Sequence, residues 1–234
     1  MGNSEKDRTQ LIDGVFTSIY KKYDLMNDVI SLGYHRIVKR RVLKHCQPGN
    51  LLDLAAGTGD LAIYFRKIFG EQYKIALADP NTDMLSFAKY RLEKLNYSNN
   101  IEYIIAYAED LPFKDNSFDN ITIGFGLRNF TDRPHALAEI YRVLRNNGRL
   151  IIIDFSKPVN PIINILNTFY LNKIVPILAN IITGNISDYR YLAKSIEEHP
   201  NQKSIMQMME AAGFTNCRYE NKLYGIIAIH YGEK

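Results

Sequence analysis

The sequence predicts an α/β protein with one doubly wound, mostly parallel sheet that ends in an antiparallel hairpin. The chain has 234 residues, of which 46% are hydrophobic and 23% are charged, so it can bury one full core. From residue 50 onward, short apolar runs alternate with helical patterns, which is typical of parallel strands joined by crossover helices. The last two apolar runs are too close together for such a helix and must pair antiparallel. We therefore expect residues 1–234 to form a single domain.

Seven apolar runs are the expected strands of the sheet. Those at 50–55, 74–79, 101–108, 118–126 and 149–155 should be parallel, and those at 217–224 and 225–231 should form the hairpin. Helical patterns lie at 60–70, 84–92, 134–144 and 202–212. A terminal hairpin in place of a further crossover is typical of the S-adenosylmethionine-dependent, Rossmann-like variant of this fold. Two segments lie outside the sheet pattern: 1–45, expected to be an N-terminal helical lid, and 158–199, expected to be a helical insertion that forms the substrate pocket.

Composition and charge disfavour several classes of protein. The net charge is only +4 and no long basic run occurs, so no nucleic-acid partner is expected. Residues 36–41 (RIVKRR) have the spacing of the solvent-facing side of an amphipathic helix. Cys46 and Cys217 lie far apart without metal-ligand spacing, so we expect no metal. The first ten residues hold no apolar signal core. We expect a cytoplasmic protein, and peripheral contact with the inner membrane stays open.

The most hydrophobic stretch is 161–182, and its length approaches that of a spanning helix. Four asparagines, Lys173 and Pro176 interrupt it, so we expect packed helices instead. Such helices could form an apolar wall that receives an isoprenoid tail. The alternative is ordinary core packing.

A glycine-containing turn follows the first expected strand and should approach a cofactor. Gly57 and Gly59 allow close approach of the backbone, and the N-terminus of the next helix offers unpaired N–H groups. Asp79 ends the second strand 22 residues after Gly57, where an acid accepts hydrogen bonds from ribose hydroxyls. The alternative is that Asp79 caps the following helix. An acid at this position disfavours a 2′-phosphorylated cofactor by charge repulsion.

The chain resembles the UbiE/MenG family of ubiquinone/menaquinone biosynthesis C-methyltransferases over nearly its whole length. The blocks that carry the resemblance include KKYDLMND, LLDLAAGTGDLA, AEDLPFKDNSFD, FGLRNF, RLIIIDFSKP and SDYRYLAKSIEEHP. The resemblance implies S-adenosyl-L-methionine as the cofactor. It also implies cofactor contacts from Thr58, Asp79, Tyr107, Ala108 and Gly124.

Three positions depart from the family pattern near this site. Ala56 stands where a second glycine is usual, Tyr107 where an asparagine is usual, and Gly124 where a serine is usual. Ala56 makes the loop slightly stiffer, Tyr107 removes an amide but adds a ring that can stack, and Gly124 removes a hydroxyl contact. We expect them to weaken cofactor affinity without abolishing binding.

Methyl transfer to carbon needs an electron-rich ring carbon, and ionising the ring's hydroxyl provides one. A phenol has a pKa near 10, so its ionisation at pH 7 costs roughly 4 kcal/mol, and a fixed cation lowers this cost. Arg128, just after the fourth strand, is our candidate for that cation. Asn129 could orient the same oxygen. The alternative is a structural arginine that ties two loops together.

The expected substrate is a polyprenylated quinol, either demethylmenaquinol or a methoxybenzoquinol. Tyr23 and Asp24 in the lid, and Tyr189 and Arg190 in the insertion, are candidates for substrate binding, with packing or salt bridging as the alternative. An O- or N-methyltransferase, a non-catalytic cofactor-binding subunit and a nicotinamide oxidoreductase are the competing functions. A homo-oligomer or a biosynthetic complex stays open.

Overall fold

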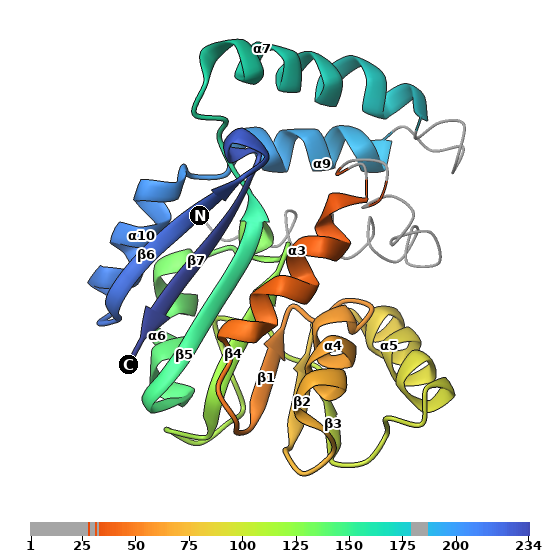
Figure 1. Cartoon of the computed structure of the whole chain (residues 1–234), viewed down its shortest axis with the longest axis vertical. Coiled ribbons are helices and arrows are strands. Elements are labelled where there is room, and N and C mark those ends of the chain that lie inside the picture. Colours follow the sequence, from red (N-terminus) through yellow and green to blue (C-terminus); the bar gives the residue numbers. More distant parts are fainter. Residues whose placement is uncertain (1–27, 29–30, 32, 179–186) are drawn as a thin grey trace, which may run out of the picture.

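The computed structural model describes residues 28, 31, 33–178 and 187–234, and for 187–192 the backbone alone. Its centre is a seven-stranded sheet in the order β3-β2-β1-β4-β5-β7-β6 (Figure 1). The strands are β1 (Leu51–Leu54), β2 (Ile75–Ala78), β3 (Ile101–Ile104), β4 (Phe118–Gly124), β5 (Leu144–Phe155), β6 (Thr215–Lys222) and β7 (Ile227–Glu233). This order, with its reversal beside β1, confirms the predicted doubly wound fold.

The first five strands are parallel, and the last two form the predicted antiparallel hairpin, in which β7 runs against the first five strands and β6 runs in their direction. β7 pairs antiparallel with β5 on one side and with β6 on the other. The second hairpin strand therefore enters the sheet and the first becomes its edge, an arrangement that the sequence pattern does not distinguish. β5 begins five residues earlier than expected, at Leu144. A turn at 146–148 lies inside the strand, where Asn147 has φ 64° and the pairing with β4 changes register.

Helices cover both faces of the sheet. They are α3 (Tyr34–Val42), α4 (Asp60–Phe69), α5 (Thr82–Lys94), α6 (Arg133–Val143), α7 (Pro161–Phe169), α9 (Ser187–Glu198) and α10 (Gln202–Ala211). Side chains of α3, α4 and α5 pack in one apolar cluster, and side chains of α6 and α10 pack in a second. Figure 1 shows α3 and α4 on the near face of the sheet. The result is the three-layer arrangement expected of strands that alternate with helices.

The helix ends follow the local chemistry of the sequence. Asn81 accepts a hydrogen bond from the Met84 N–H and caps α5, and Asp132 caps α6 in the same way through His135. α4 ends at Gly70, which has φ 77°. These side-chain and glycine caps satisfy backbone groups that each helix leaves unpaired at its ends.

A second helical layer lies across the edge of the sheet where the parallel strands end (Figure 1). It holds α7, which continues into the short π-helix η4 (Tyr170–Ile174), and α9 beneath them. Leu171 and Val175 join the core, whereas α7 itself has no fully buried residue. Within the described residues, no helix is both long and apolar enough to cross a bilayer. The predicted lid lies mostly outside the described residues, so its role stays a prediction.

Candidate cofactor and acceptor site

The turn between β1 and α4 has the open backbone that the sequence predicts. Gly57 and Gly59 both adopt left-handed conformations, with φ 53° and 79°. A Cβ at Gly59 would lie 3.1 Å from the Ala88 Cβ and 3.2 Å from Leu77 Cδ2, so this glycine lets α4 begin close against its neighbours. A Cβ at Gly57 would meet nothing within 4 Å. The backbone at Gly57 therefore borders open space, as a cradle for a ligand requires.

Asp79 lies directly beside this turn. One carboxylate oxygen accepts a hydrogen bond from the Gly57 N–H at 2.8 Å, and the other accepts one from the Asn81 N–H at 2.9 Å. The side chain is 8% exposed. Because Asn81 caps α5, the alternative that Asp79 serves as the helix cap is not what the structure shows. Asp79 instead joins the turns that follow β1 and β2, and its contact with a ribose stays a prediction.

Three charged residues beside the turn form a cluster that sequence reasoning missed. Asp60, the first residue of α4, binds Lys39 Nζ at 2.8 Å and Arg91 Nη2 at 2.9 Å. Arg91 also donates to the carbonyl oxygen of Thr58 at 2.7 Å. Burial raises the pKa of Asp60, but the two cations outweigh it and hold that pKa well below its usual value. Thr58 is thus held through its backbone while its side chain is buried.

Lys39 corrects the interpretation of residues 36–41 as a solvent-facing strip. The Lys39 side chain is 6% exposed and packs toward the end of β4 at Gly124, although its neighbours Arg40 and Arg41 are exposed. An amphipathic pattern does not reveal a buried ion pair, because its partner, Asp60, lies 21 residues away. The signal available in the sequence is the helical spacing of Lys39 from His35 at i−4 and from Val38 at i−1. The structure shows that both of these residues are buried.

The ends of β1 and β4 carry backbone strain at neighbouring positions. Ala55 and Phe125 have φ 52° and 61°, which is uncommon for residues other than glycine. A Cβ at Gly126 would lie 2.5 Å from the Ala55 Cβ, so only glycine lets the two turns come this close. Such strain concentrates at functional sites, where the surrounding structure holds it in place. It lies here at the edge of the sheet where open α/β folds bind ligands.

Arg128 is almost completely buried, at 1% exposure. Its guanidinium donates to Asp154 Oδ1 at 2.9 Å and to the carbonyl oxygen of Phe125, and it lies 5.5 Å from the centre of the Phe155 ring. Its backbone N–H donates to the second Asp154 oxygen at 3.1 Å. Arg128 therefore joins the end of β4 to the end of β5. These are the contacts expected of the structural alternative, and its role beside a phenolate stays a prediction.

The other predicted site residues are distributed around the same edge. Asn129 closes the short turn η3 (Leu127–Asn129) by donating its N–H to the Gly126 carbonyl. Tyr107 is 45% exposed in the loop after β3, and Ala108 beside it is buried. Gly124 ends β4, where an added Cβ would lie 2.9 Å from Leu61 Cδ1.

The side chains of all four predicted substrate-binding residues lie outside the described part of the chain. Tyr23 and Asp24 lie outside the described residues. Tyr189 and Arg190 belong to the first turns of α9, but their side chains lie outside the description. Among the described residues, no group of three or more histidines, cysteines or acids could hold a metal ion.

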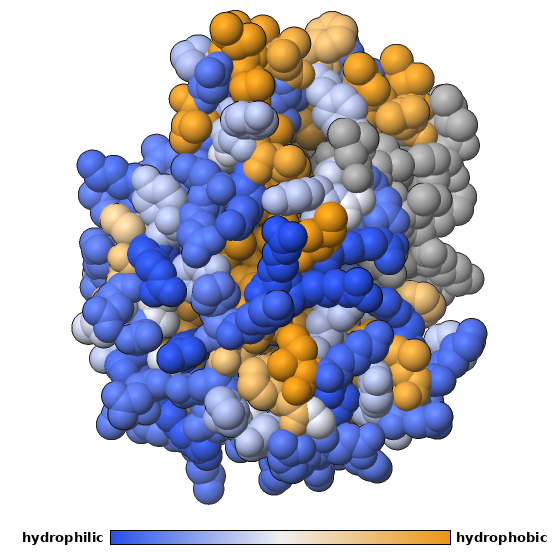
Figure 2. All heavy atoms as spheres, in the orientation of Figure 1, coloured by the Kyte–Doolittle hydropathy of each residue, from blue (hydrophilic) through white to orange (hydrophobic). Residues whose placement is uncertain are grey.

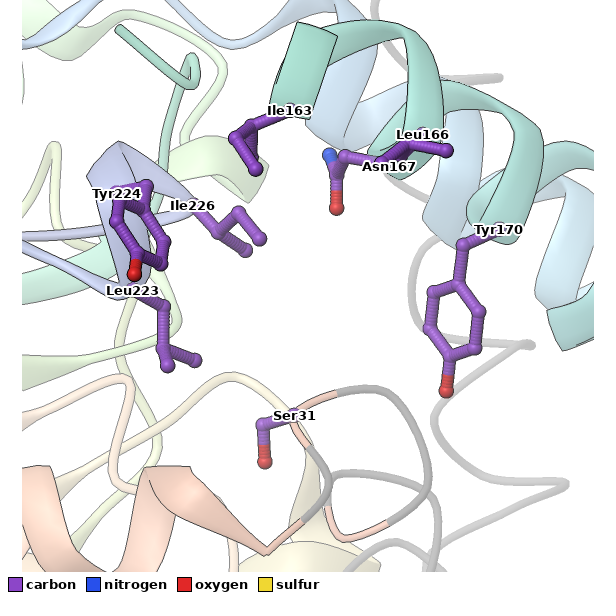
Figure 3. Close-up of a pocket in the computed structure, with 8 residues that line it drawn as sticks. All are labelled: Ser31, Ile163, Leu166, Asn167, Tyr170, Leu223, Tyr224 and Ile226. Carbon is purple, nitrogen blue, oxygen red and sulfur yellow. The ribbon is translucent and has the colours of Figure 1, made fainter. Parts of the chain in front are cut away.

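A cavity of about 290 Å³ lies under α7 (Figure 3). Its walls come from α7 and η4 on one side and from η5 (Leu223–Gly225) on the other, with Ser31 at a third side. The lining residues are Ser31, Ile163, Leu166, Asn167, Tyr170, Leu223, Tyr224 and Ile226. Most of these side chains are apolar. Ile163, Leu166, Asn167 and Tyr170 belong to the predicted insertion and the other four lining residues do not, so the substrate pocket expected within 158–199 stays a prediction.

The comparisons with known proteins agree with this geometry. The model of the ubiE/COQ5 methyltransferase family matches residues 3–234. The ubiquinone/menaquinone biosynthesis C-methyltransferase UbiE of Francisella tularensis subsp. novicida is 47% identical over 98% of this chain and 93% of its own length. UbiE of Teredinibacter turnerae is 45% identical over 97% of this chain and 93% of its own.

Solved structures support the fold alone, because their sequences are distant. A SAM-dependent methyltransferase from Thermotoga maritima has a TM-score of 0.67 at 18% identity and covers 94% of this chain and 99% of its own. One from Aquifex aeolicus has a TM-score of 0.60 at 21% identity and covers 83% of this chain and 88% of its own. The family match and the two relatives confirm the predicted resemblance, and the chain belongs to the ubiE/COQ5 methyltransferase family.

Proposed function

We propose that this chain is an S-adenosylmethionine-dependent C-methyltransferase that methylates the ring of a polyprenylated quinol in ubiquinone or menaquinone biosynthesis. The observation that carries the proposal is family membership over almost the whole chain, with relatives that are named for this activity. The fold and the glycine turn fit the cofactor. Family membership therefore supports both the predicted C-methyltransferase function and the predicted cofactor, S-adenosylmethionine.

On the donor side, the strand order arranges the residues that would hold the cofactor. S-adenosylmethionine supplies an electrophilic methyl group when it is bound. Asp79, after β2, would accept hydrogen bonds from the ribose hydroxyls, while Tyr107 and Ala108, after β3, would border the adenine. The turn at Gly57–Gly59 after β1 and Gly124 at the end of β4 then border the methionine end. These positions follow four neighbouring strands in the order β3-β2-β1-β4, so they follow one another along one edge of the sheet.

On the acceptor side, Arg128 is the proposed cation and Asn129 the proposed orienting group. A buried cation stabilises a developing phenolate strongly, because little water screens it. Asp154 lies at 2.9 Å and neutralises part of this charge. The structural alternative, in which Arg128 only ties β4 to β5, therefore stands beside the catalytic one. Tyr23, Asp24, Tyr189 and Arg190 stay candidates for holding the ring.

The cavity under α7 is the proposed binding place for the isoprenoid tail. Its lining is mostly apolar, and its volume of about 290 Å³ suits a few isoprene units better than a whole long tail. A longer tail would extend outside the protein. Of the residues on α7, Ile163, Leu166 and Asn167 line this cavity (Figure 3), and Leu166 is also 60% exposed.

The outer side of α7 is the proposed contact with the membrane in which such a tail dissolves. Ile162, Ile165 and Phe169 lie at helical spacing and are 69%, 69% and 58% exposed. Figure 2 shows apolar side chains gathered over α7. No acidic residue occurs between Asp154 and Asp188 in the sequence. An exposed apolar helix face without acids is typical of helices that lie in a lipid interface. Assembly into an oligomer or a biosynthetic complex stays a prediction.

The direct test in cells is a quinone profile of a strain that lacks this protein. We expect a demethylated quinone to accumulate and the methylated quinone to return when the gene is restored. An unchanged profile would contradict the proposal. A quinone that lacks a methyl on oxygen would instead support the O-methyltransferase alternative.

A further inference from the structure

The cavity under α7 is mostly apolar, but an amide lies in its wall. Asn167 follows Ile163 by four residues on α7, so the two side chains lie on the same side of the helix, and both line the cavity. Figure 3 shows the amide of Asn167 directed away from the helix, into the space between α7 and Ser31. Asn167 is half-buried. A hydrogen-bonding group therefore faces a space whose walls are otherwise mainly hydrocarbon.

The amide of Asn167 has hydrogen-bonding capacity that the protein does not use. It offers two donor hydrogens and one acceptor oxygen. Among the described residues, no hydrogen bond joins this amide to another side chain or to the backbone. Water can satisfy the amide while the cavity is open to solvent. A ligand that displaces this water must replace its hydrogen bonds, or binding is weakened.

The other polar groups of the wall are placed differently. The Ser31 hydroxyl lies 2.8 Å from His35 Nδ1 and accepts a hydrogen bond from the His35 N–H at 3.2 Å, so it is already engaged. Tyr224 is 71% exposed, so water reaches it. Burial raises the pKa of the Tyr170 phenol, which therefore stays neutral. Asn167 is consequently the wall residue that we expect to select a polar feature of the ligand.

An isoprenoid tail alone does not match this wall. A hydrocarbon that covered the amide would displace its water without replacing the hydrogen bonds. In a polyprenylated quinol, however, one ring hydroxyl is attached to the carbon next to the tail. A tail that enters the cavity brings this oxygen close behind it. The volume of about 290 Å³ is small for a ligand pocket and suits the first part of the tail together with the adjoining edge of the ring.

We propose that the amide of Asn167 binds the ring oxygen next to the isoprenoid tail and so determines how the quinol ring is oriented. This inference rests on the proposed function, with the tail in the cavity under α7. When the tail and the neighbouring oxygen are both held, the ring cannot rotate about its bond to the tail. One orientation of the ring is thereby fixed, which methyl transfer to one particular carbon requires.

The test compares two isomers that differ only in the place of one oxygen. The probes are 2-geranylphenol, whose hydroxyl is next to the tail, and 3-geranylphenol, whose hydroxyl is one carbon further away. Their binding to the wild-type chain and to Asn167→Leu is measured by calorimetry. We expect the wild-type chain to bind 2-geranylphenol roughly threefold to tenfold more tightly, the effect of one net hydrogen bond. Asn167→Leu, with a side chain of similar size, should bind both isomers equally.

Two control variants separate this contact from the general polarity of the helix and of the cavity. Asn164→Leu makes the same change on the same helix, at an exposed residue outside the cavity lining. Tyr170→Phe removes a phenolic hydroxyl from the cavity wall. Both variants should keep the preference for 2-geranylphenol. If Asn167→Leu aggregates, Asn167→Ala removes the amide with less added apolar surface, and it should also lose the preference.

A preference that persists in Asn167→Leu, or that is lost in Tyr170→Phe instead, would overturn the inference. A wild-type chain that binds both isomers equally, or neither of them, would overturn it too. Methyl transfer to a quinol tests the proposed function separately. A wild-type chain that methylates the quinol but shows no preference between the isomers contradicts this inference alone, whereas a folded chain that binds the cofactor and methylates no quinol contradicts the proposed function.

Discussion

The donor and acceptor sides of this molecule are built by different means. Around the glycine turn, Asp79, Asp60 and Arg91 each bind backbone or a charged partner at 2.7–2.9 Å. Around the cavity under α7, most of the lining is apolar, and α7 has no fully buried residue. The donor side is therefore specified by hydrogen bonds within the protein. The acceptor side leaves apolar surface that a tail or a membrane can cover.

The largest effect should come from breaking the ion pair that lies between the two sides. Arg128→Ala leaves Asp154 buried at 3% exposure without its cation, which should destabilise the fold by about 3–5 kcal/mol. Urea unfolding measures this loss. The double variant Arg128→Leu with Asp154→Asn should recover much of it, because no charge stays buried.

Kinetic measurements on Arg128 variants separate the catalytic role proposed for this residue from its structural role. Arg128→Lys keeps the charge, so a catalytic role predicts part of the activity, and Arg128→Ala should lower kcat about a hundredfold or more. A folded Arg128→Ala protein with near-normal kcat at pH 7 would leave only the structural role.

Acid should weaken the fold through the buried His35 of α3. The pKa of His35 is lowered from 6.5 to about 4, so its contribution is present above pH 6.5 and is lost as pH falls through 4. The free energy of unfolding lost between these two pH values should be roughly 3 kcal/mol. Burial raises the pKa of Asp53 to about 7, and this group opposes the effect, since its contribution grows as pH falls below 7.

The variant His35→Asn isolates the histidine from this background. Urea unfolding between pH 7 and 4 should show a smaller acid loss in the variant than in the wild-type chain. Parallel pH profiles for the two proteins would show that His35 does not carry the effect.

Asp79→Ala should weaken cofactor binding by roughly 1.5–3 kcal/mol, since ribose hydroxyls and the Gly57 N–H lose a charged acceptor. Calorimetry with S-adenosylhomocysteine and with 5′-methylthioadenosine, which keeps the ribose, should give equal losses. Unchanged affinity in folded Asp79→Ala protein would remove Asp79 from the site.

The smallest expected effects distinguish the two sides of α7. Ile163→Asn, inside the cavity, should lower kcat/KM for a long-tailed quinol about tenfold relative to a tail-less analogue. Ile165→Asn, outside the cavity lining, should leave this ratio unchanged. In combination with Ile162→Asn and Phe169→Asn, it should reduce flotation with vesicles of anionic lipid. Equal kcat/KM losses for both quinols in Ile163→Asn would show that the cavity holds no tail.

The sequence predicts the donor side far better than the acceptor side. Gly57, Gly59 and Asp79 are found because local rules of strand, turn and helix fix their positions, and the structure places them together. Lys39 and Asp60 are missed because their pairing depends on tertiary packing over 21 residues. The entry of β7 between β5 and β6 is missed for the same reason.

The acceptor side is hard to predict because an apolar residue makes no directional hydrogen bond or ion pair that would identify its partner. The stretch 161–182 is equally compatible with a core, a tail pocket and a membrane contact. Only the structure separates core residues such as Leu171, at 5% exposure, from cavity residues such as Ile163 and outer residues such as Ile165, at 69%.

The most direct test of the central claim is methyl transfer by the purified chain. The protein is incubated with S-adenosylmethionine that carries a labelled methyl group and with a reduced demethylated quinol, and the product is analysed by mass spectrometry and by carbon NMR. We predict one labelled methyl group on a ring carbon of the quinol. A label on a ring oxygen, or an unlabelled quinol recovered with folded, cofactor-binding protein, would contradict the claim.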